Sequence, residues 1–311
     1  MTKDLERTTA NFDIADPEQK EAWLQQRVKV LTSTDVSALF GQNPYKTKYE
    51  LWIEKASKEP QRLTESERMK WGSRLEAAIA KGAAEDYGWN VRAWNAFMTV
   101  PDLGVGSSFD YRILQSEGQP KAVLEIKAVD GWVFRKDWEE LPSGKLVPPP
   151  HIEWQVQAEM LVSRYDEAYL IALVGGNNVQ CIHFDADPEM QGAIVREAEK
   201  FWESIEDGEM PDPVYTEDLR ALSKQYQYTN PNDYTGPQID RLVTLATAHC
   251  DRKERVKIYD ADLDTIKAEV LDILRDCDGA VLPGFKKFSC KTNKKGVRSL
   301  LVTREEESNV E

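Results

Sequence analysis

The chain has 311 residues, of which 54 are acidic and 40 are basic, so its formal net charge is −14. A chain of this length can bury enough apolar surface for one elaborated domain or for two. The acidity argues against a protein that coats nucleic acid indiscriminately, although it permits a local basic track on an enzyme. No apolar run approaches the roughly 20 residues that a membrane-spanning helix needs, and residues 1–10 contain no signal-peptide apolar region.

The four cysteines lie far apart in the sequence, at Cys181, Cys250, Cys277 and Cys290. Because they show no paired short spacing, they predict neither a zinc site nor a disulfide framework. A reducing cytoplasm is the default location for such a chain.

Apolar periodicity, capping residues and turn residues predict the elements of the first two thirds of the chain. In order, we expect a polar tail at 1–15, helices at 16–27, 33–41, 49–56 and 69–85, strands at 105–113 and 123–128, a long substrate-facing loop at 130–150, a helix at 151–163, paired strands at 167–174 and 178–184, and a helix at 188–206. These elements are expected to form one catalytic core over residues 16–210.

A polar, turn-rich linker is predicted at 211–236. Two apolar periodic segments between 239 and 274 then predict a helical hairpin, followed by a basic β-hairpin at 284–302. Together they form a C-terminal extension over 237–304, before a polar tail at 305–311. The lysines of the β-hairpin could contact a DNA backbone, and a solvated hairpin is the alternative interpretation.

An unusual charge pattern lies in the strand at 123–128, where Glu125 and Lys127 project to the same side because side chains alternate along a strand. The preceding strand carries Asp110, and a turn at 116–120 lies between the two strands. A plain hairpin centred between 117 and 118 places Asp110 opposite Glu125. Two carboxylates and a lysine on one patch of sheet suit hydrolysis assisted by a divalent metal, whereas a salt-bridged strand face is the structural alternative.

Further segments occur in a characteristic order between residues 20 and 205. They are Trp23 with Arg27, Leu31–Asp35, Gly41–Tyr45, Tyr49–Trp52, Trp71–Glu76, Ser108–Asp110, Leu124–Lys127 and Trp154–Gln157. This order resembles the PD-(D/E)XK nuclease superfamily, and within it the group of phage lambda exonuclease and the YqaJ-like viral recombinases. The resemblance implies an α/β (α+β) fold like that of restriction endonucleases, with a mixed central β-sheet flanked by helices.

The resemblance also implies a metal centre that uses Mg²⁺, for which Mn²⁺ would substitute. Asp110 and Glu125 correspond to its ligands, the carbonyl of Ile126 would complete the shell, and Glu76 would hold a second metal or its water. Carboxylate and carbonyl oxygens are the ligands that such hard cations prefer.

Two further residues correspond to catalytic positions of the family. Lys127 would orient or deprotonate the attacking water, a role open to lysine because its pKa can fall when it is desolvated near cations. Gln155, with Gln157 as the alternative, would position that water or the lysine from the following helix.

A DNA end pocket is implied by Arg27 and Thr34, which match positions that contact a 5′-terminal phosphate. A guanidinium can hold phosphate bidentately, and a hydroxyl at a helix start adds a donor. A surface arginine and a plain helix cap are the alternatives. The basic residue expected before the helix glutamate is displaced: Glu67 occupies the matching position, with Arg68 and Lys70 nearby.

The sequence therefore predicts a phage-type, Mg-dependent DNA exonuclease that resects linear duplex ends for recombination, with 5′ to 3′ polarity implied by resemblance. An endonuclease on branched or single-stranded DNA and a catalytically silent DNA-binding or assembly module are the alternatives. The resemblance implies double-stranded DNA ends, a single-strand annealing protein and a homotrimer as partners, with no membrane association. The location would be the bacterial host cytoplasm if the protein is phage-encoded.

Overall fold

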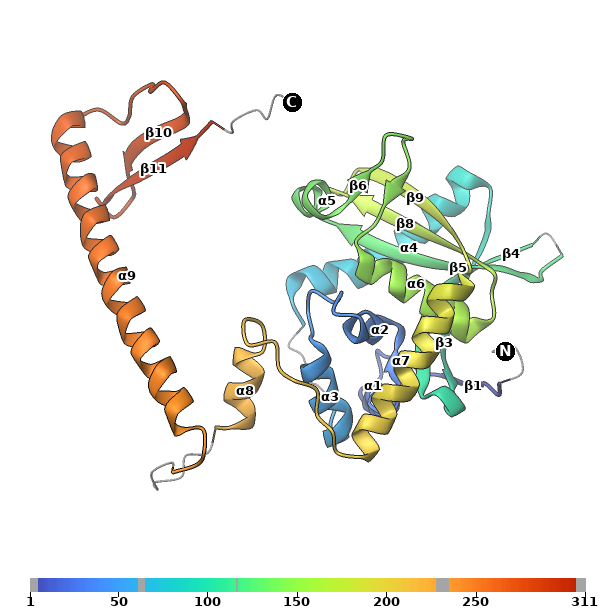
Figure 1. Cartoon of the computed structure of the whole chain (residues 1–311). Helices are drawn as coiled ribbons and strands as arrows, with labels where there is room; N and C mark the ends of the chain where they lie inside the picture. The colour runs from blue at the N-terminus through green and yellow to red at the C-terminus, as the bar shows by residue number, and fades with distance from the viewer. Residues whose placement is uncertain (1–4, 61–64, 116, 228–234, 306–311) are drawn as a thin grey trace. The chain divides into compact units, whose positions relative to one another are not determined.

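The structure is a computed structural model that describes residues 5–60, 65–115, 117–227 and 235–305. The chain forms two compact units, Met1–Gln227 and Tyr228–Glu311. The first unit is a mixed central sheet flanked by helices, which confirms the predicted fold class (Figure 1). None of the helices among the described residues is long and apolar enough to cross a bilayer.

Among the described residues, seven strands form the central sheet in the order β1-β3-β4-β5-β8-β9, and β2 pairs with β4 outside this path. The strands of the first unit are β1 (Thr8–Asn11), β2 (Leu31–Thr32), β3 (Asn90–Val100), β4 (Val105–Leu114), β5 (Pro120–Val129), β6 (Glu139–Glu140), β7 (Leu146–Val147), β8 (Glu167–Val174) and β9 (Asn178–Asp185). The pairs β5–β8 and β2–β4 are parallel, and the other neighbours on the path are antiparallel.

Among the described residues of the first unit, six helices begin and end close to the predicted bounds, and two further helices form where none was predicted. They are α1 (Pro17–Arg27), α2 (Ser33–Leu39), α3 (Lys48–Ser57), α4 (Glu67–Tyr87), α5 (Gly131–Asp137), α6 (Pro150–Ser163), α7 (Pro188–Glu206) and α8 (Leu219–Gln225). The capping signals act as expected: the Asp16 carboxylate accepts hydrogen bonds from the backbone N–H groups of Glu18 and Gln19, and α4 ends at Gly88 in the left-handed conformation.

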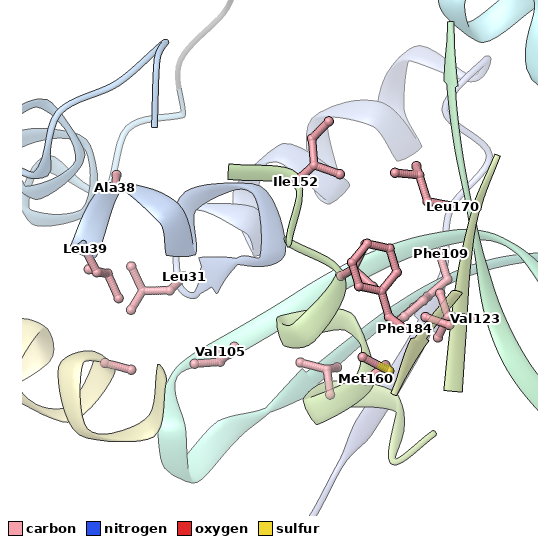
Figure 2. Close-up of a cluster of buried hydrophobic side chains, with 14 of the residues drawn as sticks. Leu31, Ala38, Leu39, Val105, Phe109, Val123, Ile152, Met160, Leu170 and Phe184 are labelled. Carbon is pink, nitrogen blue, oxygen red and sulfur yellow. The ribbon is translucent and has the colours of Figure 1, made fainter. Parts of the chain in front are cut away.

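Helices cover both faces of the sheet. On one face, Ile79 and Ala83 of α4 pack with Ile113, Leu124 and Ile171 from β4, β5 and β8. The other face carries a larger apolar cluster to which α2, α3, α6 and α7 contribute. Figure 2 shows part of this cluster, including Leu31, Val105, Phe109, Met160 and Leu170. The strand that carries Glu125 and Lys127 therefore lies between two helical layers.

Four segments of the first unit differ from the predictions. Part of the expected polar tail forms β1, because the edge of β3 offers backbone partners that require no particular side-chain pattern. Strand β3 was not predicted at all. The expected loop at 130–150 contains α5 and the small sheet of β6 and β7.

The fourth difference concerns the expected linker at 211–236, whose first part packs on the first unit. The carboxylate of buried Asp218 accepts hydrogen bonds from the Thr47 hydroxyl over 2.6 Å and from the Val214 N–H over 2.6 Å. The first unit consequently extends to Gln227, beyond the 210 expected for the catalytic core.

The C-terminal unit contains one continuous helix, α9 (Ile239–Leu274), where a helical hairpin was predicted (Figure 1). The predicted hairpin is wrong because no glycine or proline interrupts residues 239–274, and the polar residues between the two apolar segments are compatible with helix. The predicted basic β-hairpin is confirmed as β10 (Phe285–Thr292) and β11 (Arg298–Arg304). The proposed tail at 305–311 lies, apart from its first residue, outside the described residues.

Arg298 has a structural role in this hairpin. Its guanidinium donates hydrogen bonds to the carbonyl oxygens of Arg275, Cys277 and Cys290, with distances of 2.5 Å to Cys277 and 3.0 Å to Cys290. These bonds tie the hairpin to the C-terminal end of α9. The lysines of the hairpin are exposed.

Candidate active site

The hairpin of β4 and β5 brings the first two predicted site residues to adjacent strands. Tyr111 pairs with Leu124 in an antiparallel register, so Asp110 and Glu125 are the next positions on the two strands. The main-chain geometry thus agrees with the predicted placement of Asp110 opposite Glu125.

A network of side chains joins β5 to α6. Lys127 Nζ lies 2.6 Å from Glu125 Oε1 and donates to Gln155 Oε1 over 3.1 Å. The Gln155 amide donates in turn to Glu125 Oε1 over 2.9 Å. Gln155 therefore fixes the orientation of both charged residues, and the structure brings Glu125, Lys127 and Gln155 together.

Gln157, the alternative to Gln155, lies in a different environment. Its Nε2 donates to the Asp185 carbonyl over 2.9 Å, and its Oε1 accepts from the Asp187 N–H over 2.9 Å. These bonds join α6 to the end of β9 and the start of α7. Gln157 has a structural role, and Gln155 is the glutamine of the site.

Glu159 is a member of this network that the sequence reasoning missed. It lies one turn beyond Gln155 on α6, is only 1% exposed, and accepts from Gln155 Nε2 over 2.8 Å. Its other oxygen, Oε2, has no hydrogen-bond partner among the described residues. Burial, together with repulsion from Glu125, raises the pKa of Glu159 well above its ordinary value. The available signal was a glutamate within an otherwise apolar helical segment, 158–162.

The carboxylates of the site interact electrostatically although they come from different elements. Burial and repulsion from Asp110 and Glu125 raise the pKa of Glu76 on α4 to about 7. Burial and repulsion from Glu125 also raise the pKa of Asp110. Each group therefore resists ionisation, first because it is buried and second because its neighbours are acidic.

The pKa of Lys127 is raised, whereas desolvation was expected to lower it. Burial acts in that direction, but the charge and hydrogen bond of Glu125, with Glu159 and Asp110, outweigh it and raise the pKa of Lys127. The side chain is therefore an ammonium at neutral pH. In this state it can donate hydrogen bonds but cannot accept a proton.

The donor set fits a divalent cation in chemical type. Asp110, Glu125 and Glu76 supply carboxylate oxygens. Burial and then mutual repulsion raise the pKa of Asp110 and Glu76, and a bound cation would relieve that repulsion. Within the described ranges, no three acidic, histidine or cysteine side chains are gathered closely enough to form a finished metal centre. Ile126 lies in β5 opposite Ile171 of β8, and its carbonyl as a metal ligand stays a prediction.

The two residues predicted to bind a 5′-phosphate lie together at the end of α1 and the start of α2. Arg27 Nη2 lies 3.4 Å from Thr34 Oγ1, and the guanidinium lies 4.7 Å from the centre of the Trp23 ring. The Trp23 indole donates to Ser108 Oγ over 3.0 Å, two residues before Asp110 on β4. A hydrogen bond and a stacking contact therefore connect Arg27 to the strand of the acidic site.

A buried ion network supports this region and was not predicted. Lys55 is 2% exposed; its Nζ lies 2.9 Å from Asp35 Oδ2 and donates to the Arg27 carbonyl over 3.0 Å. Lys46 contacts the other Asp35 oxygen at 3.3 Å. Burial alone would raise the pKa of Asp35, but Lys55, Lys46 and Arg27 lower it well below its ordinary value.

Arg68 and Lys70 lie apart from this pair. Lys70 is bound to Glu67 at 2.8 Å on the exposed start of α4. Hydrogen bonds from the backbone N–H groups of Trp132 and Val133 lower the pKa of Asp130, and the charge of Arg68 adds to this effect. In the part of the chain that the structure describes, no hydrogen bond, ion pair or cation–π contact joins either residue to Arg27 or Thr34. Their role in binding DNA stays a prediction.

A groove of about 640 Å³ opens beside the acidic site. Its lining includes Trp23, Trp94, Ser108, Phe109 and Asp110. A cavity of about 940 Å³ lies at the other end of β4 and β5, beside Gln115 and Lys121, and contains no predicted site residue. The smaller groove is therefore the cavity that bears on the chemistry.

Comparison with known proteins gives a family match within the first unit. Residues 22–166 match the family model of the YqaJ-like viral recombinase domain. This match agrees with the resemblance seen in the sequence, and the matched range includes all of the predicted site residues.

Two kinds of relative resemble the chain. The uncharacterized protein YqaJ of Bacillus subtilis (strain 168) is 25% identical over 257 residues, which cover 82% of this chain and 76% of that protein. The alkaline exonuclease LHK-Exo of Laribacter hongkongensis is 18% identical, with a TM-score of 0.49. The match covers 66% of this chain and 98% of that chain. Its structure in complex with dAMP gives a TM-score of 0.48 at 18% identity, with 67% and 98% covered.

Proposed function

We propose that the protein is a metal-dependent DNA exonuclease of phage recombination, which degrades linear duplex DNA from its ends with 5′ to 3′ polarity. The observation that supports this proposal best is the network of Glu125, Lys127 and Gln155, with Asp110 at the neighbouring strand position, inside a viral recombinase domain. Charged groups held in this way by hydrogen bonds are suited to act on a phosphodiester.

The proposed metal is Mg²⁺, with Mn²⁺ as its substitute, held by Asp110, Glu125, the carbonyl of Ile126 and Glu76. When bound, such a cation supplies Lewis-acid polarisation of the phosphate and a more acidic water. The protein contributes the oxygen ligands, and a bound cation would stabilise the ionised form of the carboxylates.

Lys127 and Gln155 act on the attacking water and the scissile phosphate. The pKa of Lys127 is raised by Glu125, so Nζ keeps its proton and orients a water or a phosphate oxygen by donating a hydrogen bond. Gln155 holds Lys127 in place through its Oε1. Lys127 would accept a proton only if cation binding lowered its pKa.

The proposed end pocket consists of Arg27 and Thr34, with the aromatic groove beside Asp110 receiving the terminal nucleotide. A guanidinium already held over Trp23 is preorganised to bind a 5′-phosphate. Arg68 and Lys70 are proposed to contact the DNA backbone further away. A single-strand annealing protein remains the proposed partner, and the host cytoplasm the proposed location.

An assay on end-labelled linear and closed circular duplexes with Mg²⁺ tests the activity. We expect degradation of linear DNA alone, lost in Lys127→Ala and Asp110→Asn but retained in Lys81→Ala, which changes an exposed lysine of α4. Cleavage of closed circles would support the endonuclease alternative. Equal activity in all variants would contradict the site.

A comparison of substrates labelled at the 5′ or 3′ end tests polarity and end recognition. We expect early release of the 5′ label and a preference for 5′-phosphorylated ends that is lost in Arg27→Ala. Arg74→Ala is the matched control, because Arg74 stacks at 5.1 Å on Trp71 of α4 in the same type of cation–π contact. An unchanged preference in Arg27→Ala would exclude the proposed pocket.

A further inference from the structure

Helix α9 carries a stripe of side chains whose spacing is symmetric about its middle. From Val256 the steps are 3, 4, 3, 4 and 3 residues in both directions. The members are Ile239, Leu242, Ala246, His249, Lys253, Val256, Tyr259, Leu263, Ile266, Val270 and Ile273. We call these positions the α9 stripe. Alternating steps of three and four residues keep side chains on one winding face of a helix, the pattern typical of helices that pair along their length.

Within the described residues of its own unit, most of the α9 stripe is exposed to solvent. Val256 is 57% exposed, Tyr259 58%, Leu263 62% and Ile273 80%. Among the described residues, Leu274 at the end of the helix is the one buried side chain of α9, and it lies outside the stripe. A helix of 36 residues extends about 54 Å, and most helical stability in proteins comes from packing an apolar face. The stripe therefore requires a partner surface.

The symmetry of the spacing identifies a surface that fits the stripe along its whole length. If two copies of α9 pair antiparallel with Val256 opposite Val256, each stripe position meets a stripe position of the other copy. Ile239 then faces Ile273, and Leu242 faces Val270. We propose that the α9 stripe is a dimerisation surface on which a second copy of this chain binds antiparallel, about a two-fold axis at Val256. Such an interface is isologous, because both copies contribute the same residues.

The polar members of the stripe favour the antiparallel orientation. In the antiparallel pair, Lys253 faces Tyr259 of the second copy, where the ammonium can lie over an aromatic ring. In a parallel pair in register, Lys253 would face Lys253, which places like charges together. Single polar residues at such positions commonly determine the register and orientation of paired helices.

The charges beside the stripe point to the same orientation. Residues 239–255 carry four basic and three acidic side chains, a net charge of +1, whereas residues 257–273 carry two basic and five acidic ones, a net charge of −3. Antiparallel pairing sets these unlike halves against each other. Arg252 and Asp262 each lie one residue before a stripe position, so they lie on the same side of the pair, with Arg252 two residues from the position directly opposite Asp262.

The two consecutive steps of three residues meet at Val256. Two consecutive steps of three residues interrupt the alternation of three and four. Such an interruption overwinds a supercoil locally, so the two helices are expected to cross most sharply at Val256. The small side chain of Val256 is suited to a close approach. Ile258 lies off the stripe, on the opposite side of α9, and its exposure of 59% makes it a matched control.

Light scattering coupled to size-exclusion chromatography on the full chain tests the surface. We expect a wild-type mass of an even number of chains, which Leu263→Asp reduces to half and Ile258→Asp leaves unchanged. Circular dichroism checks that both variants keep the wild-type helix content. A wild-type mass of one or three chains would overturn the proposal, and so would an unchanged mass in Leu263→Asp. A halved mass in Ile258→Asp would overturn the assigned face.

Cysteine crosslinking tests the orientation in a background with Cys250→Ser and Cys277→Ser, which removes the exposed thiols of this unit. We expect Val256→Cys to form a crosslinked dimer under mild oxidation, whereas Leu263→Cys crosslinks only when mixed with His249→Cys. Self-crosslinking of Leu263→Cys as efficient as that of Val256→Cys would indicate a parallel pair and overturn the proposal.

A charge exchange provides a readout independent of the apolar positions. Arg252→Asp should raise the dimer dissociation constant, because it places two acidic residues close together on each side of the two-fold axis. Adding Asp262→Arg should restore it. A double variant that remains as weak as the single variant would overturn the proposed register.

Discussion

Gln155 and Glu159 are joined by a hydrogen bond of 2.8 Å from Nε2 to Oε1, one turn apart on α6. Because the same Nε2 also donates to Glu125, the amide cannot rotate without losing both acceptors, and its Oε1 remains directed at Lys127. The orientation of the Lys127 ammonium thus depends on Gln155, a helix residue that has no charge.

Replacement of Gln155 should lower the turnover number while leaving DNA affinity nearly unchanged. Gln155→Ala removes the group that holds Lys127, and we expect a loss of about 10- to 100-fold in kcat, as for other residues that orient a reactive group. Gln157→Ala is the matched control, because its amide bonds only to the backbone of residues 185 and 187. We expect that variant to lose stability rather than turnover. Single-turnover rates and duplex affinity would separate the two effects.

Glu159 should tolerate glutamine better than alanine. Burial and repulsion from Glu125 raise the pKa of Glu159, so the uncharged amide of Glu159→Gln should be tolerated and keeps an acceptor oxygen. Glu159→Ala leaves one of the two N–H groups of Gln155 Nε2 without its acceptor. A carboxyl whose pKa is raised on folding lowers stability once the pH exceeds its unfolded value. Urea unfolding should therefore show Glu159→Gln gaining stability over the wild type as pH rises. A constant difference between pH 4 and pH 9 would contradict the assignment.

Glu76 should make cation binding depend on pH near neutrality. Its pKa is raised from 4.5 to about 7, so the wild-type site gains a carboxylate as the pH rises through this range. We expect the affinity for Mg²⁺, measured by calorimetry, to increase from pH 5.5 to pH 8 more steeply in the wild type than in Glu76→Gln.

The same shift in Glu76 has a consequence for stability. Because the folded-state pKa is the higher one, the ionised group opposes folding, and the wild type should lose free energy of unfolding relative to Glu76→Gln between pH 4.5 and about 7. If the wild type instead gained stability over this pH range, the folded structure would not raise the pKa of Glu76.

The buried pair of Lys55 and Asp35 should be essential for stability. Asp35→Asn leaves a buried ammonium without its carboxylate, for which we expect a loss of about 3–5 kcal/mol in the free energy of unfolding. The matched control is Lys70→Met, which breaks the exposed pair with Glu67 and should cost less than about 1 kcal/mol. Since the pKa of Asp35 is lowered on folding, its stabilisation should be lost as the pH falls below 3.8.

Much of the first unit was determined by local sequence. The N-cap at Asp16, the alternation of Glu125 and Lys127 and the turn at 116–120 each specify an element or a register through residues that are near one another in the chain. The strand residues of the candidate site, Asp110, Glu125 and Lys127, followed from these signals, because a hairpin register fixes which strand residues are neighbours. The roles of Glu76 and Gln155 were implied by the family resemblance. The symmetric stripe of α9 is likewise a property of the sequence, although the sequence reasoning divided this helix in two.

Only the tertiary structure decided which polar groups share a buried space. The pairing of β1 with β3 depends on a free sheet edge, and the separate roles of Gln155 and Gln157 depend on what lies across each face of α6. The same reason explains the pKa of Lys127, which desolvation alone would lower and which Glu125 and its acidic neighbours raise. Periodicity shows that a side chain is on a given face, whereas charge interactions depend on distances between elements far apart in the chain.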